Sequence, residues 1–138
     1  MLADPNLHFF CEALVEIGEA QELGPCPSGI RRFVPVTGGR FWGEGFEARV
    51  LTGGGDWQII RPDGVVEIDT RYTLETHDGH LIYLQNTGIR HQHDGPYMRT
   101  FSRFETAEGP YAWVNHRLFI STGSKGPEGI RHQFYQIC

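Results

Sequence analysis

The sequence predicts an all-β protein, a closed antiparallel up-and-down β-barrel of lipocalin- or streptavidin-like size, with about nine strands in a single domain over residues 1–138. The chain contains 18 glycines and 12% aromatic residues; glycine suits tight turns, and aromatic side chains suit strands. Strand-like segments recur at short intervals between Gly, Pro and Asp-Gly signals. Such short connections produce antiparallel meanders, and closure of the meander removes the exposed strand edges.

Each predicted strand alternates apolar and polar residues between turn signals. The first also has helical periodicity over residues 12–21, so both structures are considered there. Pro62-Asp63-Gly64 and His77-Asp78-Gly79 are typical hairpin turns. In chain order, the predicted strands cover residues 8–17, 31–37, 45–51, 57–61, 65–76, 80–86, 97–105, 111–121 and 130–137.

The turn at residues 77–79 predicts a strand register. In a three-residue loop with Gly79 in the left-handed position, Leu74 lies opposite Ile82 and Tyr72 opposite Leu84. These residues and Ile68 then share one face, whereas a two-residue loop would mix apolar and charged side chains on both faces. The opposite face carries Glu67, Asp69, Arg71, Thr73, Glu75, Leu81, Tyr83 and Gln85.

The net charge of −5 and the isoelectric point near 5.7 argue against a nucleic-acid partner, which requires a basic surface. No apolar run approaches the length of a membrane-spanning helix. The acidic N-terminal segment lacks the basic region of a signal peptide, so we expect a cytoplasmic protein. The three cysteines, Cys11, Cys26 and Cys138, are predicted to be free thiols, with a Cys11–Cys26 bridge as the less favoured alternative.

Sequence motifs give no evidence for a cofactor or a metal. The glycines at 53–55 lead into a strand, so they form neither a P-loop nor a dinucleotide-binding turn, and no nucleophile elbow occurs. His91 and His93 would share a strand face, which is a common start for a metal site. However, the next glutamate is Glu105 and the histidines adjoin a loop signal, so we expect no metal and no cofactor.

Two charged motifs allow both a structural and a functional interpretation. Asp56-Trp57 follows three glycines, and it fits either a turn carboxylate before a core tryptophan or the mouth of a pocket. Asp69 and Arg71 alternate along one strand face and can form an ion pair. On a solvent face such a pair contributes about 0–1 kcal/mol, whereas inside a barrel it would indicate a function.

The motifs PSGIRRFVPVTGG, GGGDWQIIRPDG, DTRYTLETHDGHLIYLQNTGIR, RFET and YAWVNHRLFISTG together resemble the DUF3237 family, also called UPF0311, from about Leu14 to Gln136. The resemblance implies a calycin-like β-barrel but supplies no catalytic residues. The polar and aromatic residues that match the family pattern are Asp56, Trp57, Arg71, Tyr72, Asp78, Gly79, Arg90, Arg99, Glu105, Trp113 and Asn115.

Two functional hypotheses follow. In the first, the barrel binds one small molecule, and an enzymatic version performs proton-transfer, cyclase, isomerase or lyase chemistry on an aromatic or polyketide-like compound. Its candidate catalytic residues are Asp56, Asp69, Arg71 and Glu105, and its candidate ligand-binding residues are Trp57, Tyr83, Arg99, Trp113 and Asn115. In the second, the protein is a non-catalytic binding or assembly module whose charged strand face lies at a homodimer interface.

We expect Trp57 and Arg71 to be neighbours across one ladder, with GGGDW and the Asp69/Arg71 strand forming one polar pocket at an end of the barrel. The glycines would then let the backbone pass close to a ligand.

Overall fold

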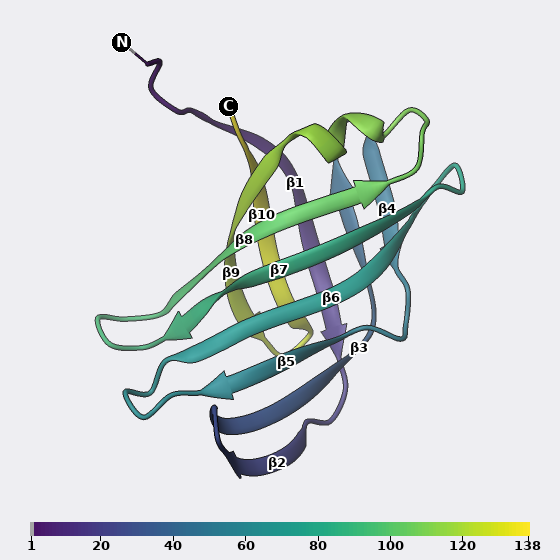
Figure 1. The fold of residues 1–138 in the computed structure, drawn as a ribbon. Coiled ribbons are helices and arrows are strands. Elements are labelled where there is room, and N and C mark those ends of the chain that lie inside the picture. Colours follow the sequence, from purple (N-terminus) through teal and green to yellow (C-terminus); the bar gives the residue numbers. More distant parts are fainter. Residues whose placement is uncertain (1) are drawn as a thin grey trace.

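The computed structural model describes residues 2–138, which form ten strands in one sheet (Figure 1). Eight strands close into an antiparallel barrel and two are additional, which confirms the predicted all-β closed barrel. A short 3₁₀ helix, η1 (Ala112–His116), lies between β8 and β9. The strands are β1 (Leu7–Ile17), β2 (Gln21–Cys26), β3 (Gly29–Gly43), β4 (Phe46–Val50), β5 (Gly55–Ile60), β6 (Val66–Thr76), β7 (Leu81–His91), β8 (Tyr97–Thr106), β9 (Leu118–Gly126) and β10 (Gly129–Ile137).

The barrel closes because β1 pairs with both β10 and β3. From β1 the ladder runs through β10, β9, β8, β7, β6 and β4 to β3, and then back to β1. The long strand β3 serves two parts of the wall: its second part pairs with β1 and β4, and its first part pairs with β2 and β5. At the end away from η1, therefore, β5 continues the wall between β3 and β6 (Figure 1).

The hairpin between β6 and β7 has the predicted register. Leu74 lies opposite Ile82 and Tyr72 opposite Leu84, and all four side chains are buried. Gly79 has a φ of 89°, in the left-handed region that the three-residue loop requires. The face with Asp69 and Arg71 is therefore the outer face of the barrel.

The predicted strands need correction in two segments of the chain. Residues 21–26 form β2, which we did not predict because Gly24 and Pro25 interrupt any strand pattern there. The predicted strand over residues 111–121 is wrong in its first part, since Ala112–His116 is η1 and β9 begins only at Leu118. The aromatic residues of this segment gave it a strand-like composition, but Trp113 instead lies over the end of the barrel.

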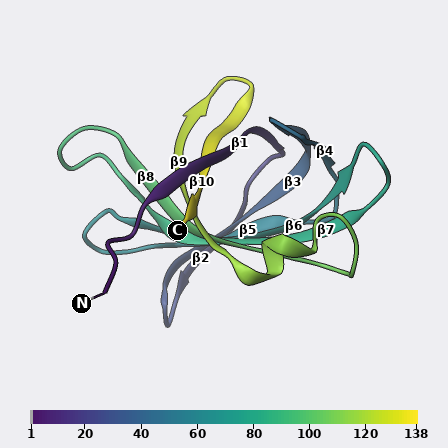
Figure 2. The ribbon, with the colours of Figure 1, turned by 90° about the horizontal axis from the view of Figure 1, so that it is seen from above.

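The interior divides into two halves. The closed half lies at the η1 end of the barrel, which faces the viewer in Figure 2. It is filled by an apolar core, and Val114 of η1 is buried against this core. Both chain ends leave the barrel at this end, where the backbones of Asn6 and Cys138 are hydrogen-bonded to each other. The closed half contains Phe41, Phe46, Leu74, Ile82, Leu84, Phe104, Phe119 and Phe134. The open half, at the β2 end, has a different lining.

Candidate functional site

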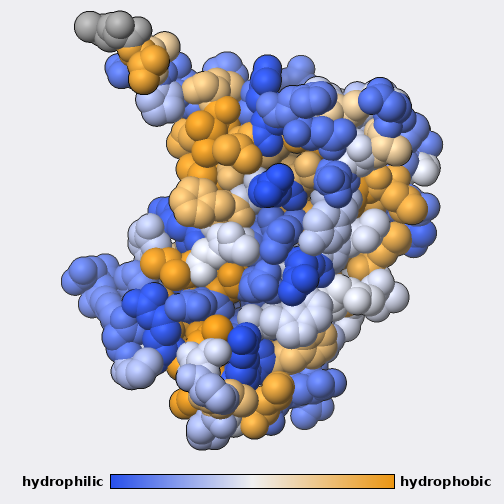
Figure 3. Space-filling view, viewed as in Figure 1, coloured by the Kyte–Doolittle hydropathy of each residue, from blue (hydrophilic) through white to orange (hydrophobic). Residues whose placement is uncertain are grey.

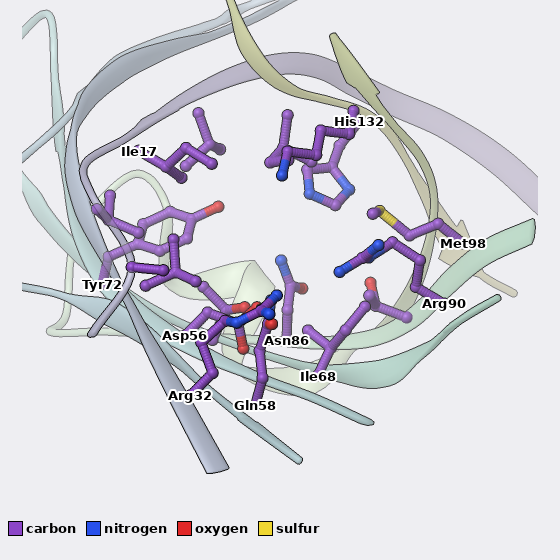
Figure 4. Close-up of a pocket in the computed structure, with 18 of the residues that line it drawn as sticks. Ile17, Arg32, Asp56, Gln58, Ile68, Tyr72, Asn86, Arg90, Met98 and His132 are labelled. Atoms are coloured by element: carbon purple, nitrogen blue, oxygen red, sulfur yellow. The ribbon is translucent and has the colours of Figure 1, made fainter. Parts of the chain in front are cut away.

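A cavity of about 180 Å³ occupies the open half of the barrel (Figure 4). Its apolar wall is formed by Val15, Ile17, Ala20, Val34, Val36, Ile68, Met98 and Ile130. Its polar side chains are those of Arg32, Asp56, Gln58, Thr70, Tyr72, Asn86, Arg90, Thr100, Lys125 and His132. A mixture of apolar walls and a few convergent polar groups is typical of small-molecule sites.

Strand alternation places two polar side chains of β5 in the cavity. Asp56 and Gln58 point inward, and Trp57 between them points outward with 40% of its surface exposed. The neighbouring β3 pairs Val34 with Asp56 and Arg32 with Gln58, so these side chains share the inner face. The GGGDW motif therefore contributes its carboxylate, and not its indole, to the interior.

Asp56 is a buried carboxylate held in a fixed position. Its Oδ1 accepts a hydrogen bond from the backbone amide of Asp69 at 3.0 Å, and its Oδ2 accepts one from Nε2 of Gln58 at 2.8 Å. Burial raises the pKa of Asp56, and the hydrogen bonds from Gln58, Asp69 and Thr70 oppose this shift. A carboxyl group with a raised pKa inside a cavity is suited to giving and taking a proton.

Three polar atoms that line the cavity have no hydrogen-bond partner among the described residues: Gln58 Oε1, Tyr72 Oη and Asn86 Oδ1. Tyr72 is 3% exposed and Asn86 is 2% exposed, so bulk water does not satisfy these groups. A buried polar group without a partner costs about 1–3 kcal/mol. Three such groups therefore surround one internal space.

A hydroxyl network lies on the side of the cavity formed by β8, β9 and β10. Ser121 Oγ is 3.1 Å from Nδ1 of His132, and the Thr100 hydroxyl is hydrogen-bonded to Ser121 Oγ. Burial lowers the pKa of His132 to about 4, so its imidazole is neutral near pH 7. Figure 4 places His132 across the cavity from Asp56.

Two glycines determine the shape of this region. A Cβ at Gly123 would collide with the side chain of Met98, which lines the cavity. A Cβ at Gly88 would collide with the backbone of Arg99 and Thr100. Both glycines therefore allow close packing of the strands around the cavity.

The structure places the predicted site residues in different regions. Asp56 lies in the cavity, whereas Trp57, Asp69 and Arg71 lie on the outer face. The predicted contact between Trp57 and Arg71 is present, with the guanidinium carbon 4.8 Å from the indole centroid. Asp69 and Arg71 are 3.4 Å apart, and both side chains are more than one-third exposed. Their strand positions have the opposite parity to the lining residues Ile68, Thr70 and Tyr72.

The other predicted residues are also outside the cavity. Tyr83, Glu105 and Asn115 line a separate surface hollow with Arg103 and Arg117. Within it, the Asn115 side chain bonds both backbone groups of Thr106, which fixes η1 onto β8.

Neither Arg99 nor Trp113 lines that hollow. Arg99 lies on the outer face of β8, where its guanidinium is 5.1 Å from the Tyr97 ring centroid. Trp113 packs on Phe10 and Phe119 at the closed end.

The glycines before Asp56 lie close to the neighbouring strands. A Cβ at Gly54 would collide with Arg71 and Tyr72, and a Cβ at Gly55 would collide with the Phe33 ring. Phe33 in turn packs against Trp57 with the ring centroids 4.9 Å apart. The expected close approach is thus to strands β6 and β3, not to the cavity.

His91 is the last residue of β7, and His93 lies in the loop that follows. Their rings are 4.7 Å apart, His91 stacks on Tyr97, and Nε2 of His93 is 2.9 Å from the carbonyl oxygen of Asp63. Within residues 2–138 no three His, Cys, Asp or Glu side chains are grouped as metal ligands. Over the same residues, no helix is long and apolar enough to cross a membrane.

Most of the lining was not among the predicted site residues. Gln58 and Asn86 lie within two of the motifs that resemble the family, but neither is among the residues that match its pattern, and His132 lies outside all of the motifs. Tyr72 and Arg90 did belong to the family pattern. For Tyr72, the predicted register placed the side chain on the apolar face with Leu74 and Ile82, and the structure shows that this is the inner face.

The fold and the cavity define a small closed β-barrel with an internal polar site at one end. The sequence model of the family described as "Protein of unknown function (DUF3237)" matches residues 5–137, and the chain belongs to this family.

Its relatives include a UPF0311 protein of Rhodopseudomonas palustris (strain TIE-1), which is 34% identical over an alignment that covers 88% of this chain and 89% of that protein. A crystal structure of a β-barrel-like protein from Acinetobacter baumannii AYE is 31% identical, with a TM-score of 0.96 over 100% of this chain and 99% of that one. A more distant relative, at 27% identity over 81% of this chain and 70% of that protein, is the hydroalkoxylation enzyme PhnH of Penicillium herquei.

Proposed function

We propose that this protein binds one small aromatic molecule in the cavity and is an acid–base enzyme that uses Asp56 and no cofactor. The observation that carries the proposal is the convergence of a buried carboxyl group with three unpartnered buried polar atoms on one cavity. The closed half already supplies an apolar core, so the polar lining of the open half is not needed for folding. Polar groups retained at such a cost are typical of functional sites.

The chemistry that fits this site is a proton transfer linked to addition or cyclisation. Hydroalkoxylation, the reaction in the name of the distant relative, adds an O–H group across a carbon–carbon double bond. In an intramolecular version, the Asp56 carboxyl proton goes to one alkene carbon and the substrate hydroxyl oxygen bonds to the other. The hydroxyl proton then returns to the Asp56 carboxylate, so substrate and product are isomers and no oxidant or reductant is consumed.

The test uses Asp56→Asn with Asp69→Asn as the matched control, because Asp69 lies on the outer face of the adjacent strand. The probes are aromatic compounds that carry both a hydroxyl group and an alkene side chain, incubated in D₂O. Mass spectrometry follows cyclised product that contains one carbon-bound deuterium. We expect turnover by the wild type, a loss of at least about a hundredfold in Asp56→Asn and no loss in Asp69→Asn.

Asp56→Asn is also expected to fold well. The raised pKa of Asp56 means that its ionised form destabilises the folded state at pH 7, and the amide removes this charge. Gln58 can rotate its side-chain amide so that the unpartnered Oε1 accepts a hydrogen bond from the new amide. A variant that is as stable as the wild type but still fully active would exclude Asp56 as the acid–base group.

A second candidate function is assembly through the outer face of β5–β8. Phe101 is 69% exposed there, beside the exposed Trp57 and the Asp69–Arg71 pair, and Figure 3 shows hydrophilic side chains mixed with apolar ones on this face. A homodimer through this face would bury Phe101 and Trp57. Analytical ultracentrifugation of the wild type and of Phe101→Asp tests it, because the substitution would convert a dimer into a monomer.

A further inference from the structure

We infer that the ligand of this cavity is an aromatic acid, a ring compound with a carboxylate at one end and a hydroxyl group at the other. This inference rests on the proposed role of the cavity as the ligand site. It specifies the ligand class from three features of the lining: its positive charge, the size and apolarity of the cavity, and its unpartnered hydrogen-bonding groups.

The charge of the lining is opposite to that of the whole protein. The chain has 17 acidic and 12 basic residues, whereas the cavity is lined by three cations, Arg32, Arg90 and Lys125, and by one carboxyl group, Asp56. A cavity of one sign concentrates ligands of the other sign. The local excess of positive charge therefore favours an anionic ligand.

Arg90 is the cation best placed to hold the anion. It lies near the end of β7, opposite Val66 and Met98, and Figure 4 shows its guanidinium extending into the cavity. Among residues 2–138, no acidic side chain lies within ion-pair distance of Arg90 or Lys125, and the charge of Arg90 acts on Asp56 only at longer range. Arg32 differs, because its Nε bonds the Glu22 carboxylate at 2.7 Å. A planar guanidinium without a partner matches a carboxylate in a two-hydrogen-bond geometry.

The apolar lining and the volume of the cavity suit an aromatic ring. Val15, Val36, Ile68 and Met98 contribute apolar surface to the cavity wall. The volume of about 180 Å³ is slightly larger than that of an engineered apolar cavity of about 150 Å³ that binds benzene. One substituted ring or a fused pair is therefore the scale of ligand that fits.

The unpartnered polar atoms of the cavity match a hydroxyl group on the ligand. Asn86 Oδ1 and Gln58 Oε1 can only accept hydrogen bonds, whereas the Tyr72 hydroxyl can donate as well. A ligand hydroxyl can donate to the Asn86 oxygen and accept from Tyr72 at the same time. Along β7, Asn86 and Arg90 both point inward and are four residues apart, so the two ends of one ligand can engage the same strand.

The experiment compares 6-hydroxy-2-naphthoate with 6-hydroxy-2-naphthamide, which has the same shape but no charge. Binding is measured by fluorescence titration at pH 7.5 for the wild type, Arg90→Gln and Arg99→Gln. Arg99 is the matched control, because it lies on the adjacent strand opposite Ile89 and on the outer face. Arg90→Lys is included because it keeps the charge and loses the planar geometry.

We expect the wild type to bind the acid at least about tenfold more tightly than the amide. Arg90→Gln should remove this preference, because binding of the acid weakens and binding of the amide does not change. Arg90→Lys should show a preference between those of the wild type and Arg90→Gln. Arg99→Gln should bind both compounds as the wild type does. Equal binding of acid and amide would overturn the inference and leave the cavity as the proposed site. Absence of binding by both compounds would overturn the aromatic-acid class, while the proposed function would still be decided by Asp56→Asn.

Discussion

The two halves of the barrel share the same strands but not the same chemistry. In the closed half, the inner face carries phenylalanine, leucine and isoleucine side chains that are less than 5% exposed. In the open half, the same inner face carries Asp56, Gln58, Asn86 and His132 around a cavity. The backbone hydrogen-bond ladder is continuous through both, so the sheet itself does not require this change.

Individual strands make the change within a few residues. Going along β7, the inward positions are Ile82 and Leu84, then Asn86, Gly88 and Arg90. On β9, Phe119 is followed at inward positions by Ser121, Gly123 and Lys125. The closed half can therefore supply the stability of the fold while the open half is free to carry groups that cost stability.

The largest expected effect sharpens this contrast. Phe119→Ala removes a ring that is 1% exposed and packs on Phe10, Phe104 and Trp113. The free energy of unfolding should therefore fall by about 4 kcal/mol. Ile68→Ala in the cavity wall should cost about 2 kcal/mol, because this side chain already borders empty space. Urea denaturation measures both. Equal losses would mean that the halves contribute alike.

The next effect depends on pH. His132 has a pKa lowered to about 4, against an unperturbed 6.5, so the folded protein keeps it neutral while the unfolded chain takes up a proton below pH 6.5. Its contribution is complete above pH 6.5 and is lost as the pH falls towards 4. Between pH 7 and pH 4.5 the wild type should lose about 2.5 kcal/mol that His132→Gln does not lose.

Because His132→Gln can alter stability at both pH values, the quantity to compare is the change in the free energy of unfolding between pH 7 and pH 4.5 in each protein. Asp63 and Asp78 have lowered pKa values, so their stabilising contributions are lost only below their unperturbed value of 3.8, outside the window. If the free energy of unfolding falls by the same amount between pH 7 and pH 4.5 in both proteins, His132 is not a buried neutral group.

A smaller effect, of opposite sign, comes from Tyr72→Phe. The substitution removes a hydroxyl that is buried without a partner, so the free energy of unfolding should rise by about 1 kcal/mol while binding of 6-hydroxy-2-naphthoate weakens. The matched control is Tyr111→Phe, because the Tyr111 hydroxyl donates to Asp78 at 2.8 Å and its loss should cost about 1 kcal/mol. Thermal or chemical denaturation distinguishes them, and a loss of stability in both would show that Tyr72 has a partner.

The sequence predicted the closed half better than the open half. The register of β6 and β7 followed from apolar alternation and from Gly79, and both are observed. However, the predicted strand over residues 80–86 stops where β7 becomes polar, although the strand continues to His91. Strand prediction uses apolar alternation, and a cavity lining replaces it with Asn86, Gly88 and Arg90. The residues that build the site therefore resemble a turn.

The same limit explains why Asp56 was predicted and Asn86 and His132 were not. Asp56 belongs to a conspicuous motif, whereas the other two become site residues only when distant strands close into a ring. Trp57 and Arg71 were predicted because an indole and a guanidinium on neighbouring strands can stack and contact a ligand. Parity places them on the outside, and one strand position decides between the two faces.

The smallest expected effect concerns that outer pair. Arg71→Met keeps an apolar side chain over Trp57 and removes the cation–π contact and the ion pair with Asp69. Both charged side chains are more than one-third exposed, so solvent screens the pair and the stability should fall by no more than about 0.5 kcal/mol. Binding of the naphthoate probe should not change, because Arg71 is outside the cavity. If instead binding is lost while denaturation is unchanged, the ligand contacts the outer face, and the division between a structural exterior and a functional open half is wrong.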